Sequence, residues 1–409
     1  MEIGTGGIGC GNQMPNSLNS GLRVRPQQSA SSFSYVSTPK IAEVPAPRKS
    51  LLKQCAPGPW GDIEFHYLYL EASSALVDVF QMPTSVPRWS FPGLTRDEIR
   101  AIFMKAGIPT YGIERWMTGC LLEQSGVIHI LPPIPDLEAL TAVQRSSIYA
   151  TLAQWEVNTF HKDPVFITGG DAREFLRNTD IEADHAAWFE RMCYRRGHVL
   201  CFSDVRALLS RARSDSEVRR LFKLCSRTRT LVARLRLTPE TDYDSLTAYW
   251  SKGGRRKDVL TMLKSVAEAP GAEHLDLIHM LPPLPRKLLY SYPPLELAMH
   301  GRMPDCHWTS LNFFNYEPRE YYIDTRLASS HVIENFAPVD APYRFGDVLF
   351  FLEGPTLQAF HSCVFVADDI VFTKNGDNAA NPWVLSHLED LRQVYLSGSG
   401  GYVQGYRRK

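Results

Sequence analysis

Three short stretches near the C-terminus decide the fold class: PDCHWTSL at residues 304–311, GDVLFF at 346–351 and AFHSCVFVADDIVFTKNG at 359–376. Asp305 is a favourable N-cap residue, so we expect Cys306 at the first position of a helix that ends near residue 315. The second stretch is typical of a buried strand, and the third is typical of a β-hairpin. A helix followed by antiparallel strands predicts an α+β domain.

The chemistry of this region rests on a thiol and an imidazole. Because the start of a helix favours negative charge, we expect the pKa of Cys306 to be lowered and its thiolate fraction to be raised. His361 begins the second strand and suits a base that takes and returns a proton near neutral pH. Thr373 and Asn375 lie two residues apart at the next strand, so either could orient the imidazole, and we favour Thr373.

This arrangement resembles the NlpC/P60 superfamily of papain-like cysteine peptidases and amidases over roughly residues 296–409. In that superfamily an Asp-Cys pair opens a helix, a strand follows, and a second strand begins with histidine and turns into a third. The resemblance implies that Cys306 is the nucleophile, His361 the base and Thr373, twelve residues later, the third member. It also implies that the backbone N–H of Cys306 contributes to an oxyanion hole.

The resemblance carries a function with it. It implies a bacterial cysteine hydrolase that cleaves amide or peptide bonds without a cofactor, with cell-wall peptide as substrate. Similar enzymes often use a tyrosine upstream of the nucleophile as a further oxyanion donor, which makes Tyr290 and Tyr292 candidates.

Two other interpretations stay open. The chain has His307-Trp308 after the cysteine and Ser362-Cys363 after the histidine, where the superfamily usually has Ser-Gly and Val-Gly. The domain could therefore be degenerate and serve a non-catalytic binding or scaffold protein. Cys363 shares a strand face with His361, so the two could bind a metal together with Cys306. Because a fourth ligand at suitable spacing is missing, we expect no metal site.

The rest of the chain divides by composition. Residues 1–58 are rich in Gly, Ser, Pro, Asn and Gln, which predicts a disordered tether. Residues 59–295 show helical periodicity between capping residues, which predicts a mostly α-helical domain of unknown role. The helices expected there cover about residues 96–105, 137–155, 180–197, 203–209, 214–235, 242–250 and 255–268.

Charge limits the partners that this protein can recruit. The 409 residues include 44 Lys or Arg and 44 Asp or Glu, so no net charge attracts nucleic acid or an anionic membrane. Thirteen of the basic residues lie in the Arg-rich segment, residues 191–236. Their helical spacing favours a solvated helix face, with an anionic partner as the alternative. Without interleaved aromatic residues, we expect no specific nucleic-acid recognition.

The sequence also bears on location. It contains no run of eighteen apolar residues, so we expect no transmembrane segment. The start of the chain lacks the basic and apolar regions of a secretory signal, which predicts the cytoplasm. The NlpC/P60 resemblance instead implies a location outside the cell membrane, if the N-terminus is incomplete, and the compartment stays open.

Overall fold

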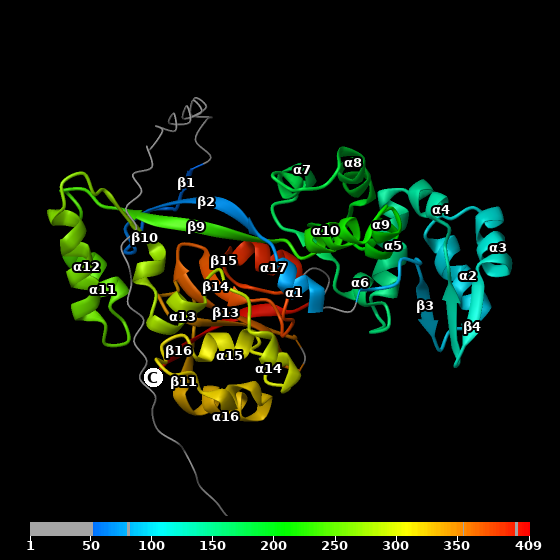
Figure 1. The fold of residues 1–409 in the computed structure, drawn as a ribbon. Coiled ribbons are helices and arrows are strands. Elements are labelled where there is room, and N and C mark those ends of the chain that lie inside the picture. The colour runs from blue at the N-terminus through cyan, green and yellow to red at the C-terminus, as the bar shows by residue number, and fades with distance from the viewer. Residues whose placement is uncertain (1–51, 80–81, 355, 397–399) are drawn as a thin grey trace, which may run out of the picture. The chain divides into compact units, whose positions relative to one another are not determined.

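The longest strand pair in this computed structural model joins β2 (Asp62–Leu70) to β9 (Thr228–Arg236), which run antiparallel. The pairing extends from Asp62 opposite Arg236 to Leu70 opposite Thr228. Short strands β1 (Lys53–Gln54) and β10 (His274–Asp276) flank the pair and complete a four-stranded sheet (Figure 1). The structure describes residues 52–409 except 80, 81, 355 and 397–399, all within one compact unit.

The chain between β2 and β9, which we call the inserted lobe, has its own hydrophobic core. Two three-stranded antiparallel sheets support it, in the orders β3-β5-β4 and β6-β8-β7. Their strands are β3 (Trp89–Pro92), β4 (Leu121–Gln124), β5 (Val127–Ile130), β6 (Val165–Ile167), β7 (Tyr194–Arg196) and β8 (Val199–Phe202). Its helices are α1 (Ser74–Val79), α2 (Arg96–Lys105), α3 (Thr110–Gly119), α4 (Ile134–Ala139), α5 (Ala142–Leu152), α6 (Thr159–Lys162), α7 (Ala172–Leu176), α8 (Ala183–Met192), α9 (Val205–Ser210) and α10 (Asp215–Cys225).

The region after β9 is built on a six-stranded antiparallel sheet in the order β11-β16-β12-β13-β14-β15. Its strands are β11 (Phe336–Val339), β12 (Val348–Leu352), β13 (Ala359–Ala367), β14 (Ile370–Lys374), β15 (Trp383–His387) and β16 (Tyr402–Arg408). The helices around it are α11 (Tyr243–Trp250), α12 (Arg256–Glu268), α13 (Pro283–Leu288), α14 (Leu295–Met299), α15 (Cys306–Leu311), α16 (Thr325–Asn335) and α17 (Leu388–Leu396), with 3₁₀ turns at Leu277–Met280 and Glu320–Ile323.

Side chains of the sheet alternate between two hydrophobic layers. On one face, Val364 and Phe372 pack in the core that also holds Trp308 of α15. On the other face, Cys363 and Val371 pack against Leu391 of α17. The sheet therefore lies between α15 and α17, and neighbouring strand residues reach opposite helices.

The edge strand β15 is covered by β9. The hydroxyl of Thr230 donates to the carbonyl oxygen of Leu385 at 2.9 Å, and its oxygen accepts from the Leu385 N–H at 3.1 Å. Nearby, the hydroxyl of Tyr67 lies 3.0 Å from the imidazole of His387. Since an open sheet edge leaves backbone groups without partners, these side chains complete the edge.

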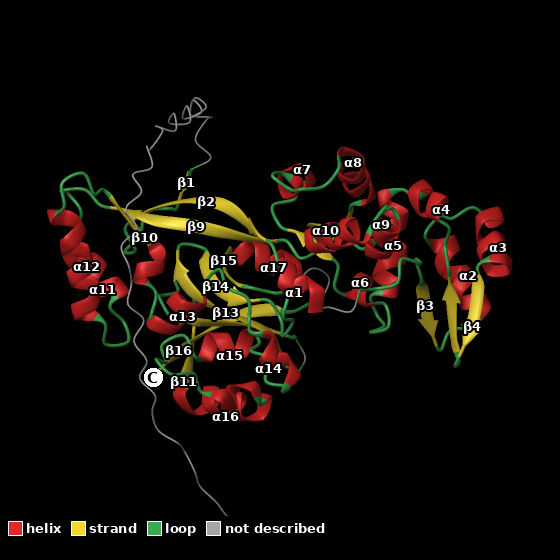
Figure 2. Ribbon diagram, in the orientation of Figure 1, coloured by secondary structure: helices red, strands yellow, loops and turns green. Residues whose placement is uncertain are grey.

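The mixed architecture agrees with the predicted α+β class (Figure 2). Several helices also begin where expected: Thr95 caps α2 with a full capping box, and Asp242 caps α11. However, the region predicted as mostly helical also holds β2, β9 and the two small sheets. The boundary expected between residues 295 and 296 falls inside a shared core, to which both Leu231 and Phe372 contribute.

Three predicted helices are wrong in extent. The helix expected over residues 214–235 ends at Cys225, and the rest is β9, where Leu231, Ala233 and Leu235 are buried at every second position. The helix expected to reach Gly197 ends at Met192, because Tyr194–Arg196 instead pair with β8 as strand β7, and Gly197 turns the hairpin with a positive φ of 59°. The third, over 137–155, is split into α4 and α5.

The predicted tether of residues 1–58 lies mostly outside the described residues. At its C-terminal end, β1 pairs with β2, with Lys53 opposite Phe65. We expected order to begin near Trp60, but the pairing of β1 places ordered residues earlier in the chain. The reason is that the edge of β2 offers backbone groups that the preceding segment satisfies.

Asp347, just before β12, allows a test of how the six-stranded sheet is held. The carboxylate is fully buried and accepts from Arg407 of β16 at 2.8 and 2.6 Å, and from the Arg344 N–H at 2.7 Å. We predict that Asp347→Asn lowers the free energy of unfolding by about 3 kcal/mol, because it breaks a buried charge pair. Urea denaturation measures this loss. Glu123→Gln, which removes a half-exposed pair with Arg96, should change stability by under about 0.5 kcal/mol, and equal effects would contradict the prediction.

Candidate active site

Cys306 occupies the first position of α15, as predicted. The carboxylate of Asp305 accepts from the Trp308 N–H at 2.7 Å, which caps the helix. The hydroxyl of Thr309 donates back to the Asp305 carbonyl at 2.7 Å. The helix ends at Leu311 rather than near residue 315, so it is a single short element fixed at its start.

The prediction of a lowered thiol pKa is wrong for the resting protein. Cys306 is 5 % exposed, and burial, followed by the charge of Asp305, raises its pKa to about 12. Backbone N–H groups of Ser362, Cys306 and His307 act in the opposite direction, but they are the weaker influences. Desolvation of the thiolate outweighs the helix N-terminus, so the thiol is neutral at rest.

The imidazole of His361 is buried near the N-terminal end of β13, an inner strand of the six-stranded sheet. Its Nε2 atom lies 3.3 Å from the hydroxyl oxygen of Thr373, and its ring stacks on Tyr395 with a centroid distance of 4.0 Å. Phe351 packs edge-on against the same ring. Burial, with a smaller contribution from the charge of His307, lowers the pKa of His361 well below its usual value. The imidazole is therefore neutral too.

The hydrogen bonds of Thr373 determine what the two ring nitrogens can do. The Thr373 hydroxyl also lies 3.3 Å from the carbonyl oxygen of Ser362, to which it can donate. In that arrangement its oxygen accepts the Nε2–H of His361, and the lone pair is on Nδ1. Nδ1 is buried and has no hydrogen-bond partner among the described residues. A buried nitrogen with a free lone pair is the atom that a thiol proton needs.

The Cys306 thiol lies close to the residues that surround His361. The N–H of Ser362, the residue after His361, lowers the thiol pKa by hydrogen bonding, which requires close approach. A charge on Cys306 would also raise the pKa values of Cys363 and Tyr395. Cys363 neighbours Ser362, and Tyr395 stacks on the imidazole, so the structure brings Cys306 and His361 to one region.

A polar link attaches α15 to β13. The hydroxyl of Ser362 lies 3.1 Å from the Cys306 carbonyl oxygen and 3.1 Å from the Ser310 hydroxyl. His307 Nδ1 lies 3.0 Å from the same hydroxyl, and its ring stacks on Phe350. His307 therefore helps to hold the start of the helix against the strand.

The other predicted site residues lie less favourably. Asn375 follows β14, and its Oδ1 is buried without a hydrogen-bond partner among the described residues, so Thr373 rather than Asn375 contacts His361. The hydroxyl of Tyr290 donates to the Leu231 carbonyl at 2.6 Å. Tyr292 packs with a small cluster near α1. The Tyr290 hydroxyl is therefore already engaged, whereas the Tyr292 hydroxyl is buried without a partner among the described residues, and an oxyanion role for Tyr292 stays a prediction.

The metal interpretation is also unsupported. Cys306, His361 and Cys363 do not form a group with ligand atoms close enough to share an ion. Within the part of the chain that the structure describes, only Glu182, Asp184 and His185 form such a group, and Arg211 and Arg213 lie beside it.

Two residues near the thiol were missed by sequence reasoning. Tyr395 comes from α17, and no local pattern links it to a histidine on β13. Lys374 follows Thr373, is fully buried, and donates to the carbonyl oxygens of Gly376 and Asn378 at 2.8 and 3.0 Å. Burial lowers its pKa to about 8, while the charges of Asp377 and Cys306 act in the opposite direction. The sequence did offer one signal for Lys374, because it directly follows Thr373, the predicted third member.

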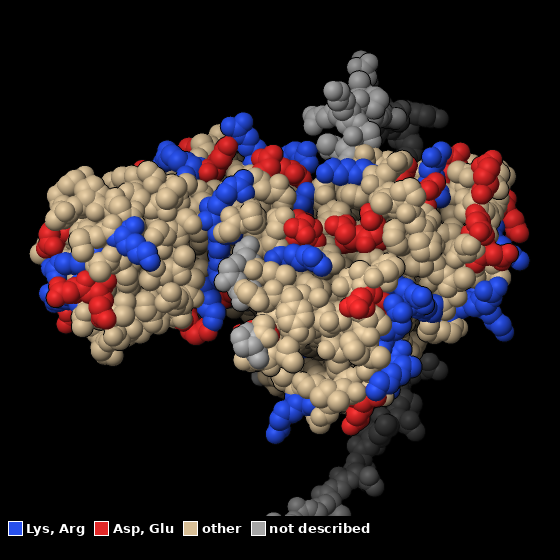
Figure 3. Space-filling model, turned by 180° about the vertical axis from the view of Figure 1, so that it is seen from behind, with Lys and Arg blue, Asp and Glu red and all other residues tan. Residues whose placement is uncertain are grey.

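Most of the Arg-rich segment is neutralised within the protein. Nine of its thirteen basic residues lie within 4.0 Å of a carboxylate: Arg191, Arg211, Arg213, Arg219, Arg220, Lys223, Arg227, Arg229 and Arg234. On the face drawn in Figure 3, basic and acidic side chains are interspersed. An anionic partner for this segment stays a prediction.

No helix among the described residues has the length and apolarity needed to cross a membrane.

The raised thiol pKa predicts how Cys306 responds to pH. Below a pKa of about 12, the thiolate fraction grows with pH, so iodoacetamide alkylation should accelerate roughly tenfold per pH unit between about pH 7 and pH 9. Mass spectrometry of the peptide containing Cys306 measures the rate, and Cys306→Ala confirms its assignment. A rate that is already constant below about pH 7 would show a lowered pKa and contradict the prediction.

Comparisons with protein-family models, curated proteins and solved structures find no match for this chain, so its NlpC/P60 relationship stays a prediction.

Proposed function

We propose that the C-terminal region is a cysteine hydrolase of amide or peptide bonds, with a fold like that of NlpC/P60 enzymes. The observation that carries the proposal is the state of the His361 ring. Thr373 engages one nitrogen, while the other is buried without a hydrogen-bond partner among the described residues, and the Cys306 thiol lies at the N–H of the next residue, Ser362. Nucleophilic thiol catalysis requires a base that is oriented by a third group and comes within hydrogen-bond reach of the thiol, so Cys306 must approach Nδ1 when substrate binds.

The proposed reaction begins with a neutral thiol and a neutral imidazole. The sulfur of Cys306 attacks the carbonyl carbon while its proton passes to Nδ1 of His361. The C–N bond then breaks, the leaving amine takes the proton from His361, and a thioester remains on Cys306. Water attacks the thioester and gives a proton to His361. The imidazole returns this proton to the departing sulfur as the carboxylic acid is released.

Two further features fit this chemistry. The N–H of Cys306 lies at the first position of α15, where no intrahelical acceptor exists, so it can donate to an oxyanion. Tyr395 and Phe351 hold the imidazole plane from the α17 side, which restricts ring rotation. The substrate class that we propose is peptide, with bacterial cell-wall peptide suggested by the NlpC/P60 resemblance.

A non-catalytic binding or scaffold protein is the second candidate, and burial favours it. Cys306, His361 and Thr373 are 5 %, 1 % and 0 % exposed. The three cavities described lie in the inserted lobe or between α11 and α12, and none is lined by these residues. Under the hydrolase proposal, substrate must gain access by movement of the segments that cover the thiol.

Loss of the thiol separates the two candidates. We predict that Cys306→Ala reduces hydrolysis of bacterial cell-wall peptides by at least about a thousandfold, because the covalent step is lost. The release of new amino groups measures the reaction. Cys120→Ala, at a half-buried cysteine that follows α3, should retain full activity. Undiminished hydrolysis by Cys306→Ala would rule out Cys306 as the nucleophile, and no hydrolysis by the unaltered protein would favour the scaffold.

Thr373 tests the orientation of the base. We predict that Thr373→Val, which keeps the shape but removes the hydroxyl, lowers kcat about ten- to a hundredfold with little change in KM. Thr373 lies behind the imidazole and is fully buried, so it should not contact substrate. Thr373→Ser keeps the hydroxyl and should restore most of kcat. Equal losses in both variants would instead indicate a packing role.

A further inference from the structure

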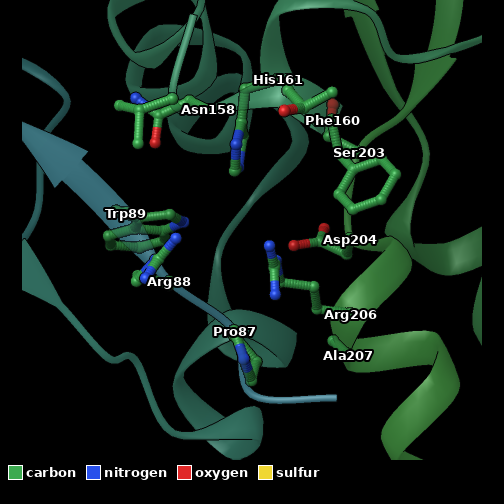
Figure 4. Close-up of a pocket in the computed structure, with 12 residues that line it drawn as sticks. Pro87, Arg88, Trp89, Asn158, Phe160, His161, Ser203, Asp204, Arg206 and Ala207 are labelled. Carbon is green, nitrogen blue, oxygen red and sulfur yellow. The ribbon is translucent and has the colours of Figure 1, made fainter. Parts of the chain in front are cut away.

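A polar hollow lies in the inserted lobe, apart from the cysteine site. It is bounded by the start of β3, by α6 and by the start of α9, and its cavity volume is about 20 Å³, room for about one water-sized group. Figure 4 shows the side chains of Arg88, His161, Asp204 and Arg206 directed toward one space. Because so small a cavity holds about one water-sized group, the hollow suits a single oxygen of an anionic group that enters from its open mouth, and not a macromolecule.

The two arginines bring positive charge that the described residues do not balance. Arg206 belongs to the Arg-rich segment, yet it has no carboxylate within 4.0 Å in the described part of the chain, and its guanidinium contacts Thr84. Arg88 is half-buried and makes no hydrogen bond or ion pair with any described residue. Burial, and then the charge of Arg88, lower the pKa of Arg206. Two cations held together in this way favour an anion between them.

The one carboxylate in the hollow is already occupied. Asp204 accepts from the Tyr149 hydroxyl at 2.6 Å, and its second oxygen lies 3.5 Å from Nε of the buried Arg145. Arg145 thus offsets the negative charge of Asp204 from behind the hollow. The charges of Arg88 and Arg206 remain on the ligand side.

A neutral donor completes the site. His161 is 8 % exposed, and its Nε2 has no hydrogen-bond partner among the described residues. Burial, followed by the charge of Arg206, lowers the pKa of His161 to about 3, so the ring is neutral and Nε2 can carry a hydrogen for an anionic oxygen. Trp89 is buried, and the ring of Phe160 lies beside Arg206, with 5.8 Å between the guanidinium carbon and the ring centroid.

We propose that this hollow binds the anionic group of a small molecule, a carboxylate or a phosphate, between Arg88 and Arg206, with His161 as a neutral donor. This binding site goes beyond the proposed hydrolase and does not depend on it.

Isothermal titration calorimetry of the full chain tests the proposal, with inorganic phosphate, acetate and phenyl phosphate at constant ionic strength. We predict saturable binding of at least one of these anions. Arg88→Gln should weaken it about tenfold or more, because a charged contact is lost and the side chain supports no other described residue. Arg195→Gln, an exposed arginine in the hairpin after α8, is the matched control and should bind as the unaltered protein does.

Arg206→Gln provides a second variant, with its thermal unfolding recorded because Arg206 also contacts Thr84. A folded Arg206→Gln protein should lose affinity as Arg88→Gln does. Binding of acetate alone, or of the phosphate compounds alone, supports the site and identifies the group it takes. Absence of saturable binding to all three anions, or equal affinities for Arg88→Gln and Arg195→Gln, would overturn the proposal.

Discussion

The pairing of β2 with β9 is the constraint on which the rest of the structure depends. Nine residues of each strand form the ladder, and the whole inserted lobe lies between them in the sequence. Closing so long a segment costs conformational entropy, but that cost grows only slowly with length, so one long ladder is sufficient. Because Thr230 of β9 also satisfies Leu385 at the edge of the six-stranded sheet, the lobe and the sheet share a single scaffold.

Competition between burial and local electrostatics determines the state of the candidate site. A helix N-terminus stabilises a negative charge by roughly 0.3–1 kcal/mol, which is less than a tenfold change in acidity. Packing of α15 against β13 removes water from Cys306 and raises its pKa to about 12, a larger effect. The same burial keeps His361 neutral. Proton transfer in the proposed reaction must therefore accompany attack, since no ion pair exists beforehand.

Features that depend on neighbouring residues were predictable from sequence. Thr95 and Asp305 cap the helices that they were expected to cap, because N-cap bonds span only three residues. Alternation placed His361 and Cys363 on one strand face. The same reasoning failed for residues 228–235, where arginines among apolar residues fit helical spacing as well as strand spacing. Pairing with the distant β2 decided in favour of a strand, and no local signal carries that information.

The sequence by itself determined the α+β class, the start of the cysteine helix, the hairpin that carries His361, and the choice between two residues for its orienting partner. Only the tertiary structure decided that Thr373 rather than Asn375 contacts the imidazole, that Tyr395 stacks on it, and that the thiol is neutral. It also brought Arg88 and Arg206 together. The physical reason is that burial and contacts between distant elements arise from packing, which local spacing does not specify.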